Sequence, residues 1–204
     1  MGFYSQRILP YLFDWSLSST SLTPYRQEIL ADVQGAVLEI GFGTGLNLPY
    51  YPNHIRKIVT VDPNPGVHKL AQKRIAESPI AVEHQLLTSE SLPMPDHTFD
   101  SVVSTFTLCS IADVEQALSE IYRVLKPSGR FFFVEHGLGP EPGMQVWQNR
   151  LTPLQKIIGD GCHLNRNMRE LIDRHFDSVK IAEKYVEGLP KVGAYLYKGI
   201  ATKK

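Results

Sequence analysis

Val37-Leu38-Glu39-Ile40-Gly41-Phe42-Gly43-Thr44-Gly45 is an apolar run that leads directly into three alternating glycines. The run has the length and composition of a buried parallel strand, and glycine permits the sharp turn that must follow such a strand. Because glycine has no side chain, a ligand can approach the backbone N–H groups of the loop closely. The stretch therefore predicts a strand followed by a loop that binds a ligand through its backbone.

The spacing of these glycines argues against two common nucleotide-binding loops. A dinucleotide fold places its glycines as G-x-G-x-x-G, but the last position of that count is Leu46 when it starts at Gly41, or Leu48 when it starts at Gly43. A Walker loop requires Gly-Lys followed by Ser or Thr, which this stretch lacks. A nucleotide-dependent oxidoreductase is therefore a disfavoured alternative.

Two acidic residues accompany the glycine loop. Glu39 lies inside the apolar run, where a carboxylate is costly unless it has a partner, and a bound cation or ammonium group would supply one. Asp62 follows the apolar run 58–61, where a carboxylate can accept hydrogen bonds from both hydroxyls of a ribose. Asp62 could instead only cap the helix that begins near Pro65, but the glycine loop favours the ribose.

Composition and charge favour a small-molecule partner. The 204 residues include 21 basic and 21 acidic side chains, so binding driven by nucleic-acid phosphates or an anionic membrane is disfavoured. No run approaches the roughly 18 apolar residues of a membrane span, and we expect no integral membrane association. Cys109 and Cys162 are too few for a disulfide framework, which favours a cytoplasmic location.

Alternating apolar runs and amphipathic stretches predict a parallel sheet with crossover helices. Strands are expected at 36–41, 57–62, 80–86, 99–105 and 130–136, and helices at about 145–159 and 166–176. A further helix should follow the fourth strand, from a capping-box-like Asp113 and Gln116 to a stop at Pro127 and Gly129. Asn64 and Pro65 have the residue types of a helix cap and a first helical position.

Several ordered motifs resemble the class I methyltransferases that use S-adenosylmethionine. The resemblance covers about residues 35–137 and rests on Glu39-x-Gly41-x-Gly43-x-Gly45, Asp62, Ser91–Asp100 and Leu125–Arg130. A closer resemblance, to the thiol methyltransferases of animal microsomes, extends to about residue 166. It rests on Asn47 with Tyr51-Pro52, Asp62-Pro63-Asn64-Pro65, Thr105-x-x-Leu108-Cys109-Ser110, Phe133-x-Glu135-His136 and Asp160-Gly161-Cys162.

The resemblance implies an α/β, Rossmann-like fold with a seven-stranded, mostly parallel sheet, helices on both faces and an antiparallel last strand. It also implies a single methyltransferase domain, 1–204. Its parts would be an N-terminal lid or helical segment (1–34), a cofactor-binding core (35–137), a helical insert that covers the substrate side (138–176) and a C-terminal hairpin (177–204). The microsomal relatives carry an N-terminal membrane anchor that we expect to be absent here.

The resemblance further implies the residues that bind S-adenosylmethionine. Glu39 and the glycine loop would hold its methionine end, Asp62 its ribose, and residues 88–90 would flank its adenine. Many relatives have an aspartate where this chain has Thr88, so Ser89 or Glu90 is expected to substitute. The expected cofactor-binding residues are Glu39, Gly41, Gly43, Gly45, Asn47, Asp62, Pro63, Asn64, Ser89, Glu90, Thr105 and Phe106.

The expected function is methyl transfer to a small-molecule acceptor, with a thiol favoured. Alternatives are transfer to a lipid or quinone oxygen or nitrogen, and a catalytically silent domain that only binds S-adenosylmethionine. His136, at the end of the fifth strand, is either the catalytic candidate or a structural histidine. Residues 1–22 and 138–170 should form the acceptor pocket. His54, His84, His97 and His163 lack partners at metal-ligand spacing, so no metal is expected. The oligomeric state stays open.

Overall fold

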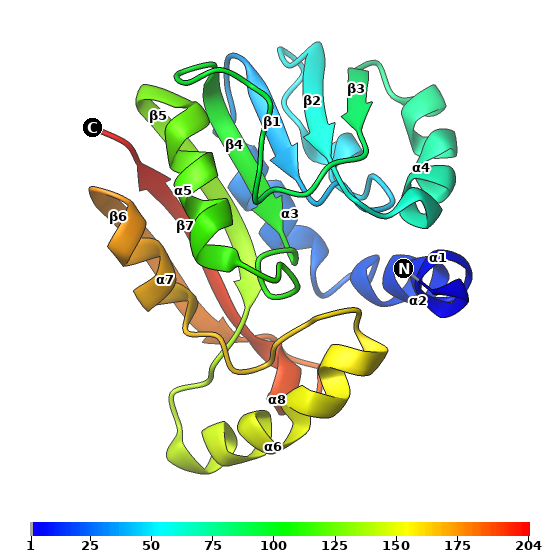
Figure 1. Cartoon of the computed structure of the whole chain (residues 1–204), viewed down its shortest axis with the longest axis vertical. Helices are drawn as coiled ribbons and strands as arrows, with labels where there is room; N and C mark the ends of the chain where they lie inside the picture. The colour runs from blue at the N-terminus through cyan, green and yellow to red at the C-terminus, as the bar shows by residue number, and fades with distance from the viewer. Residues whose placement is uncertain (1) are drawn as a thin grey trace.

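The fold is a twisted sheet with helices on both faces (Figure 1). The computed structural model describes residues 2–204. Within them, seven strands form one sheet in the order β3-β2-β1-β4-β5-β7-β6. The strands are β1 (Val37–Ile40), β2 (Lys57–Val61), β3 (Ala81–Gln85), β4 (Phe99–Thr105), β5 (Leu125–His136), β6 (Ser178–Tyr185) and β7 (Tyr195–Thr202). The expected fold class is confirmed, because β1 to β5 pair in parallel and β7 runs antiparallel to both of its neighbours.

The helices divide between the two faces of the sheet. One face packs against α5 (Val114–Val124) and α7 (Met168–His175), and the other against α3 (Thr23–Leu30) and α4 (Pro65–Glu77). Residues 131–134 of β5 contribute side chains to both faces of the sheet, because successive side chains of a strand point to opposite faces. Phe131 and Phe133 join the α5 side of the core, and Phe132 and Val134 join the α3 side.

The two expected helix starts are confirmed by their caps. The Asn64 side chain accepts a hydrogen bond from the backbone N–H of Gly66 at the start of α4. The Asp113 side chain accepts one from the N–H of Gln116 at the start of α5. The end of α5 differs from expectation, because the helix ends at Val124, before Pro127 and Gly129. Both of these residues lie in β5, which begins at Leu125.

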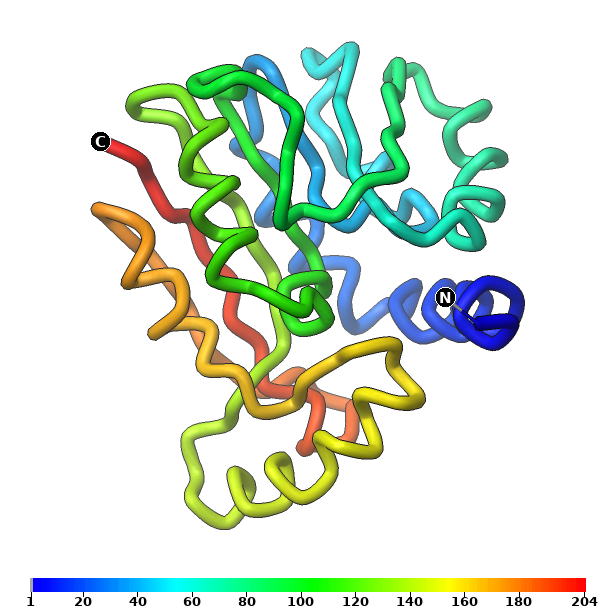
Figure 2. Tube along the Cα trace, viewed as in Figure 1, coloured from blue at the N-terminus to red at the C-terminus, as the bar shows by residue number. Residues whose placement is uncertain are grey.

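Residues 2–204 also contain three further helices and two short ones. They are α1 (Phe3–Arg7), α2 (Leu9–Leu17), α6 (Pro142–Ile158), α8 (Lys191–Ala194) and the 3₁₀ turn Leu48–Tyr50. The N-terminal segment divides at Ile8 into α1 and α2, and Pro10 lies in the first turn of α2, where proline is tolerated. The trace in Figure 2 shows α1 and α2 beside α4. It also shows α6 beyond the carboxyl end of β5. Among residues 2–204, no helix has both the length and the apolar content needed to cross a membrane.

Candidate active site

A cavity of about 360 Å³ lies at the carboxyl ends of β1, β2 and β4. Parallel sheets commonly bind ligands at this edge, where the order of the strands reverses. Eleven of the twelve expected cofactor-binding residues line the cavity: Glu39, Gly41, Gly43, Asn47, Asp62, Pro63, Asn64, Ser89, Glu90, Thr105 and Phe106. Gly45 does not line the cavity; its φ is +80°, and its N–H donates a hydrogen bond to the carbonyl of Phe42 at 3.1 Å.

Two glycines shape the cavity in different ways. Gly41 has a φ of +68°, and a Cβ added there would lie 2.1 Å from Oγ1 of Thr107, so glycine is needed for packing. Gly43 has a φ of +56°, and the nearest atom to an added Cβ is the carbonyl oxygen of Gly41 at 3.9 Å. Because Gly43 also lines the cavity, a side chain at this position would enter space that a ligand can occupy.

Asp62 ties the glycine loop to the start of α4. Its Oδ2 accepts a hydrogen bond from the N–H of Gly43 at 2.9 Å, and its Oδ1 accepts one from the N–H of Asn64 at 2.9 Å. Burial raises the pKa of Asp62, although the two N–H donors oppose that shift. A carboxylate oxygen can accept more than one hydrogen bond, so both oxygens keep accepting capacity at the cavity wall.

Glu39 is buried at the cavity wall, and both of its carboxylate oxygens have polar partners from this chain. Asn47 donates a hydrogen bond to its Oε1 at 2.8 Å, and the Tyr51 hydroxyl donates one to its Oε2 at 2.7 Å. Arg26 in turn donates to Oδ1 of Asn47 at 2.7 Å and to Oγ1 of Thr105 at 2.9 Å. The partner that a buried carboxylate requires is therefore supplied internally, and not only by a ligand.

This cluster also sets the protonation of Glu39. Burial raises the pKa of Glu39 to about 7, against the opposing effects of Tyr51, Asn47 and Arg26. Arg26, itself buried, also lines the cavity, although the sequence did not predict it as a site residue. Nothing local marks it, because its partners lie 21 and 79 positions further along the chain.

The N-terminal helices are fastened over the cavity by polar contacts. Asp14 of α2 accepts a hydrogen bond from Thr44 in the glycine loop at 2.6 Å and forms an ion pair with Arg74 of α4 at 2.7 Å. Ser5 of α1 accepts one from Asn64 on its backbone oxygen at 2.9 Å. Phe13 and Leu17 of α2 line the cavity, so this segment forms part of its cover.

A second cavity, of about 530 Å³, is lined by α6 and by the segment that leads into α8. Its wall is mostly apolar, and Ser16 of α2 also contributes to it, so α2 borders both cavities. The lining residues are Ser16, His136, Leu151, Leu154, Gln155, Ile158, Leu164, Leu189, Pro190, Val192 and Gly193. This cavity draws on both segments expected to form the acceptor pocket, and additionally on residues 189–193.

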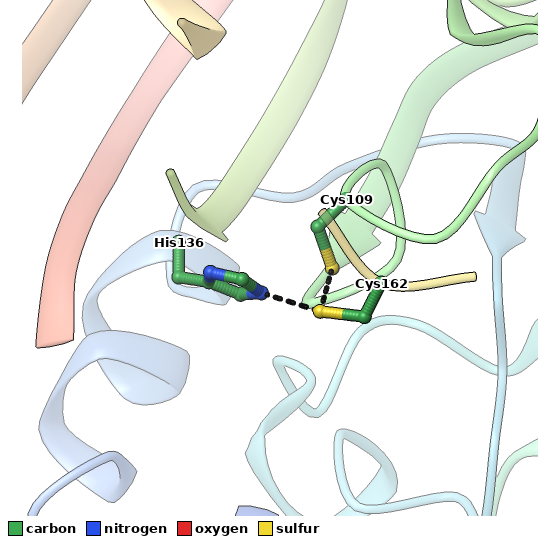
Figure 3. Close-up of side chains that lie close together, drawn as sticks. All are labelled: Cys109, His136 and Cys162. Carbon is green, nitrogen blue, oxygen red and sulfur yellow. Dashed lines mark hydrogen bonds between the residues drawn. The ribbon is translucent and has the colours of Figure 1, made fainter. Parts of the chain in front are cut away.

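His136 lies at the second cavity and not at the first. Its Nε2 is 3.1 Å from Sγ of Cys162, which is 3.8 Å from Sγ of Cys109 (Figure 3). The pKa of the Cys162 thiol is raised, because its hydrogen bond to Cys109 and its burial disfavour ionisation. The sequence did not predict this group, since its three members are far apart in the chain.

Comparisons with known proteins show similarity to methyltransferases. The family model described as a methyltransferase domain matches residues 38–133. Thiol S-methyltransferase TMT1B of Rattus norvegicus is 38% identical over 150 residues, which are 71% of this chain and 61% of that protein, less than two thirds of its length. The TMT1B of Homo sapiens is 32% identical over 177 residues, 80% of this chain and 72% of that protein.

The fold has close structural counterparts as well. A crystal structure from Thermotoga maritima, described as a SAM-dependent methyltransferase and possible histamine N-methyltransferase, superimposes with a TM-score of 0.68. The sequences are 21% identical, and the match covers 98% of each chain. At that identity the likeness concerns the fold alone.

Proposed function

Because the chain belongs to the class I S-adenosylmethionine-dependent methyltransferases, we propose that its acceptor is a small, partly apolar thiol bound in the second cavity. The observation that carries the proposal is the adjacency of the two cavities, which share α2 as a common wall. One cavity has the polar groups for a nucleoside, and the other has an apolar lining with few polar groups, as is usual for small-molecule sites. The similarity to thiol methyltransferases supports the choice of a thiol.

The first cavity fits S-adenosylmethionine in size and chemistry. Its volume of about 360 Å³ lies in the range of small-molecule sites. We propose that Asp62 accepts hydrogen bonds from the ribose hydroxyls and that Gly43 lets the methionine end approach the loop backbone. We propose that Ser89 and Glu90, which line the cavity, flank the adenine, although one carboxylate oxygen of Glu90 already accepts a hydrogen bond from the N–H of Asp113.

The protonation of Glu39 predicts how cofactor affinity depends on pH. The pKa of Glu39 is about 7, so its carboxylate is charged above that pH and attracts the methionine ammonium group, and is neutral below it. We expect the affinity for S-adenosylmethionine to fall about tenfold as the pH is lowered from 8 to 6. Calorimetric titration at several pH values measures this.

The matched control for this prediction is Glu39→Gln. A carboxamide can keep the hydrogen bonds with Asn47 and Tyr51, because the tyrosine hydroxyl can also accept. The variant should bind more weakly at pH 8 and show little further loss down to pH 6. A wild-type affinity that stays constant across this range contradicts the proposed role of Glu39.

The transfer step needs orientation more than it needs a strong base. When bound, S-adenosylmethionine supplies a methyl group on a positively charged sulfonium. The chain would align the acceptor in line with that group and exclude water, and positioning of this kind can contribute about 7–11 kcal/mol. A thiol with a pKa near 8.5 already has a few percent of thiolate at neutral pH, so a protein base is not essential.

Thiol transfer is tested with labelled cofactor and three matched acceptors: benzyl thiol, benzyl alcohol and benzylamine. We expect the thiol to be methylated at least 100-fold faster than the other two. Below the thiol's pKa, kcat/KM should rise up to about tenfold for each pH unit, because the thiolate is the nucleophile. The measurement is initial rate against pH for the full chain.

A variant of α6 localises the acceptor in the same assay. Leu154→Arg places a charge in the apolar lining, so we expect the KM for the thiol to rise about tenfold while cofactor affinity is unchanged. Ile157→Arg is the control, since Ile157 lies on the same helix, is 74% exposed and is not in the lining. Preferred methylation of the alcohol or amine contradicts the thiol proposal. Cofactor binding without product from any acceptor indicates a silent binding domain.

A further inference from the structure

Three side chains that can ligate a metal converge beside the second cavity (Figure 3). Nε2 of His136 and the sulfurs of Cys109 and Cys162 all lie within 4.8 Å of one another. Both cysteines are free thiols and both are buried, while His136 lines the second cavity. Ser110 and Asp160, close in sequence to the two cysteines, line the first cavity. The group therefore lies between the expected cofactor and the proposed acceptor.

The spacing of the three atoms approximates one face of a tetrahedral zinc site. With zinc–sulfur bonds of about 2.3 Å, two sulfur ligands lie about 3.8 Å apart, and a sulfur and an imidazole nitrogen about 3.5 Å apart. The observed distances are 3.8 Å between the two sulfurs and 3.1 Å between Cys162 and His136. The third pair, Sγ of Cys109 and the ring nitrogen of His136, lies within 4.8 Å, so a small movement of the imidazole would bring both nitrogen–sulfur distances to about 3.5 Å.

The backbone around the cluster is held in place by several independent contacts. The N–H of His163 donates a hydrogen bond to the carbonyl of Cys109 at 2.8 Å, which joins the two cysteine segments. Arg166 donates to the carbonyls of Leu108 and Ile111. Gly161 has a φ of +94°, and an added Cβ would lie 2.9 Å from the carbonyl oxygen of Ser110, so only glycine allows this approach. The two thiols are thus positioned before any ligand binds.

We propose that Cys109, His136 and Cys162 form a binding site for a thiophilic divalent cation, Zn²⁺ in the first instance. Thiolate and imidazole ligands favour zinc over magnesium or calcium, and two thiolates neutralise its charge, so the buried site gains no net charge. A disulfide explains the arrangement less well. It would require the sulfurs to approach to about 2.05 Å and gives no role to the histidine.

Three protein ligands leave a fourth coordination position, as in catalytic zinc sites. Since His136 lines the second cavity, a ligand in that cavity can reach the metal. The fitting ligand is the thiol of the acceptor, which would release its proton to solvent and bind as a thiolate. This last step rests on the proposed thiol transfer, whereas the metal site itself does not. The proposed metal site departs from the expectation of no metal, because that expectation considered only the spacing of residues along the chain.

The test is a cobalt titration of the full chain after treatment with reductant and chelator. We expect one equivalent of Co²⁺ to bind with the intense visible bands of a tetrahedral site and with a thiolate-to-cobalt charge-transfer band, and Zn²⁺ to displace it. Cys109→Ser and Cys162→Ser should each weaken binding at least 100-fold, and His136→Ala at least tenfold. His54→Ala, an exposed histidine outside both cavities, should bind like the wild type. Thermal melting of the metal-free variants checks that they fold.

The outcomes separate the metal site from the thiol reaction. A wild-type chain that takes up no Co²⁺ or Zn²⁺, or whose two cysteines prove to be disulfide-bonded, overturns the proposal even if the variants fail to fold. Charge-transfer bands that appear in both serine variants with the intensity and the cobalt affinity of the wild type also overturn it. Metal binding without thiol methylation keeps the metal site and rejects the proposed function. Thiol methylation by a chain that binds no metal does the reverse. A benzyl thiol that alters the cobalt bands supports the fourth ligand, and unaltered bands contradict it.

Discussion

Replacing Gly43 by valine is expected to abolish measurable binding of S-adenosylmethionine while the domain stays folded. The φ of Gly43 is +56°, the residue lines the cavity, and the nearest heavy atom to an added Cβ is 3.9 Å away. A valine would therefore occupy the space that a ligand needs beside the loop backbone. We expect the affinity to fall more than 100-fold in a calorimetric titration.

In this variant, the effect of backbone strain must be separated from steric exclusion of the ligand, because a residue other than glycine at positive φ destabilises the fold by about 1–3 kcal/mol. Gly188→Val is the matched control. Gly188 has a φ of +80°, its nearest contact to an added Cβ is Oγ of Ser21 at 3.9 Å, and it does not line the cofactor cavity. Both variants should lose similar thermal stability, and only Gly43→Val should lose binding. Equal cofactor affinity in the two contradicts the assigned position of the ligand.

The first strand, its glycine turn and two helix caps could be predicted because their signals are local in the sequence. The apolar run 37–40 and the glycines after it specify a strand and its turn without reference to the rest of the chain. Asn64 and Asp113 cap their helices through bonds to residues two and three positions away. Features whose physical cause lies within a few residues are those that a single sequence can reveal.

The features missed from the sequence depend on contacts between distant segments. Arg26 is buried beside Asn47 and Thr105, and nothing near it in the chain indicates that it pairs with them. Cys109 and Cys162 are 53 positions apart, and each alone resembles a small buried apolar residue. Only the carboxyl ends of β4 and β5, together with the loop after α6, bring the two cysteines and His136 together.

Asp62→Ala is expected to weaken S-adenosylmethionine binding about 100-fold or more. Each hydrogen bond to a charged group contributes about 1.5–3 kcal/mol, and about 1.4 kcal/mol corresponds to a factor of ten in affinity, so two lost ribose bonds account for this size. The carboxylate also holds the N–H groups of Gly43 and Asn64, so its loss could act through the loop instead. Titration with a demethylated cofactor that lacks the ribose 2′-hydroxyl distinguishes lost ribose contacts from a disturbed loop. The wild type should bind this deoxy compound more weakly than the intact demethylated cofactor, whereas the variant should bind the two compounds equally. If the variant still discriminates between them as strongly as the wild type, Asp62 supports the loop and does not contact the ribose.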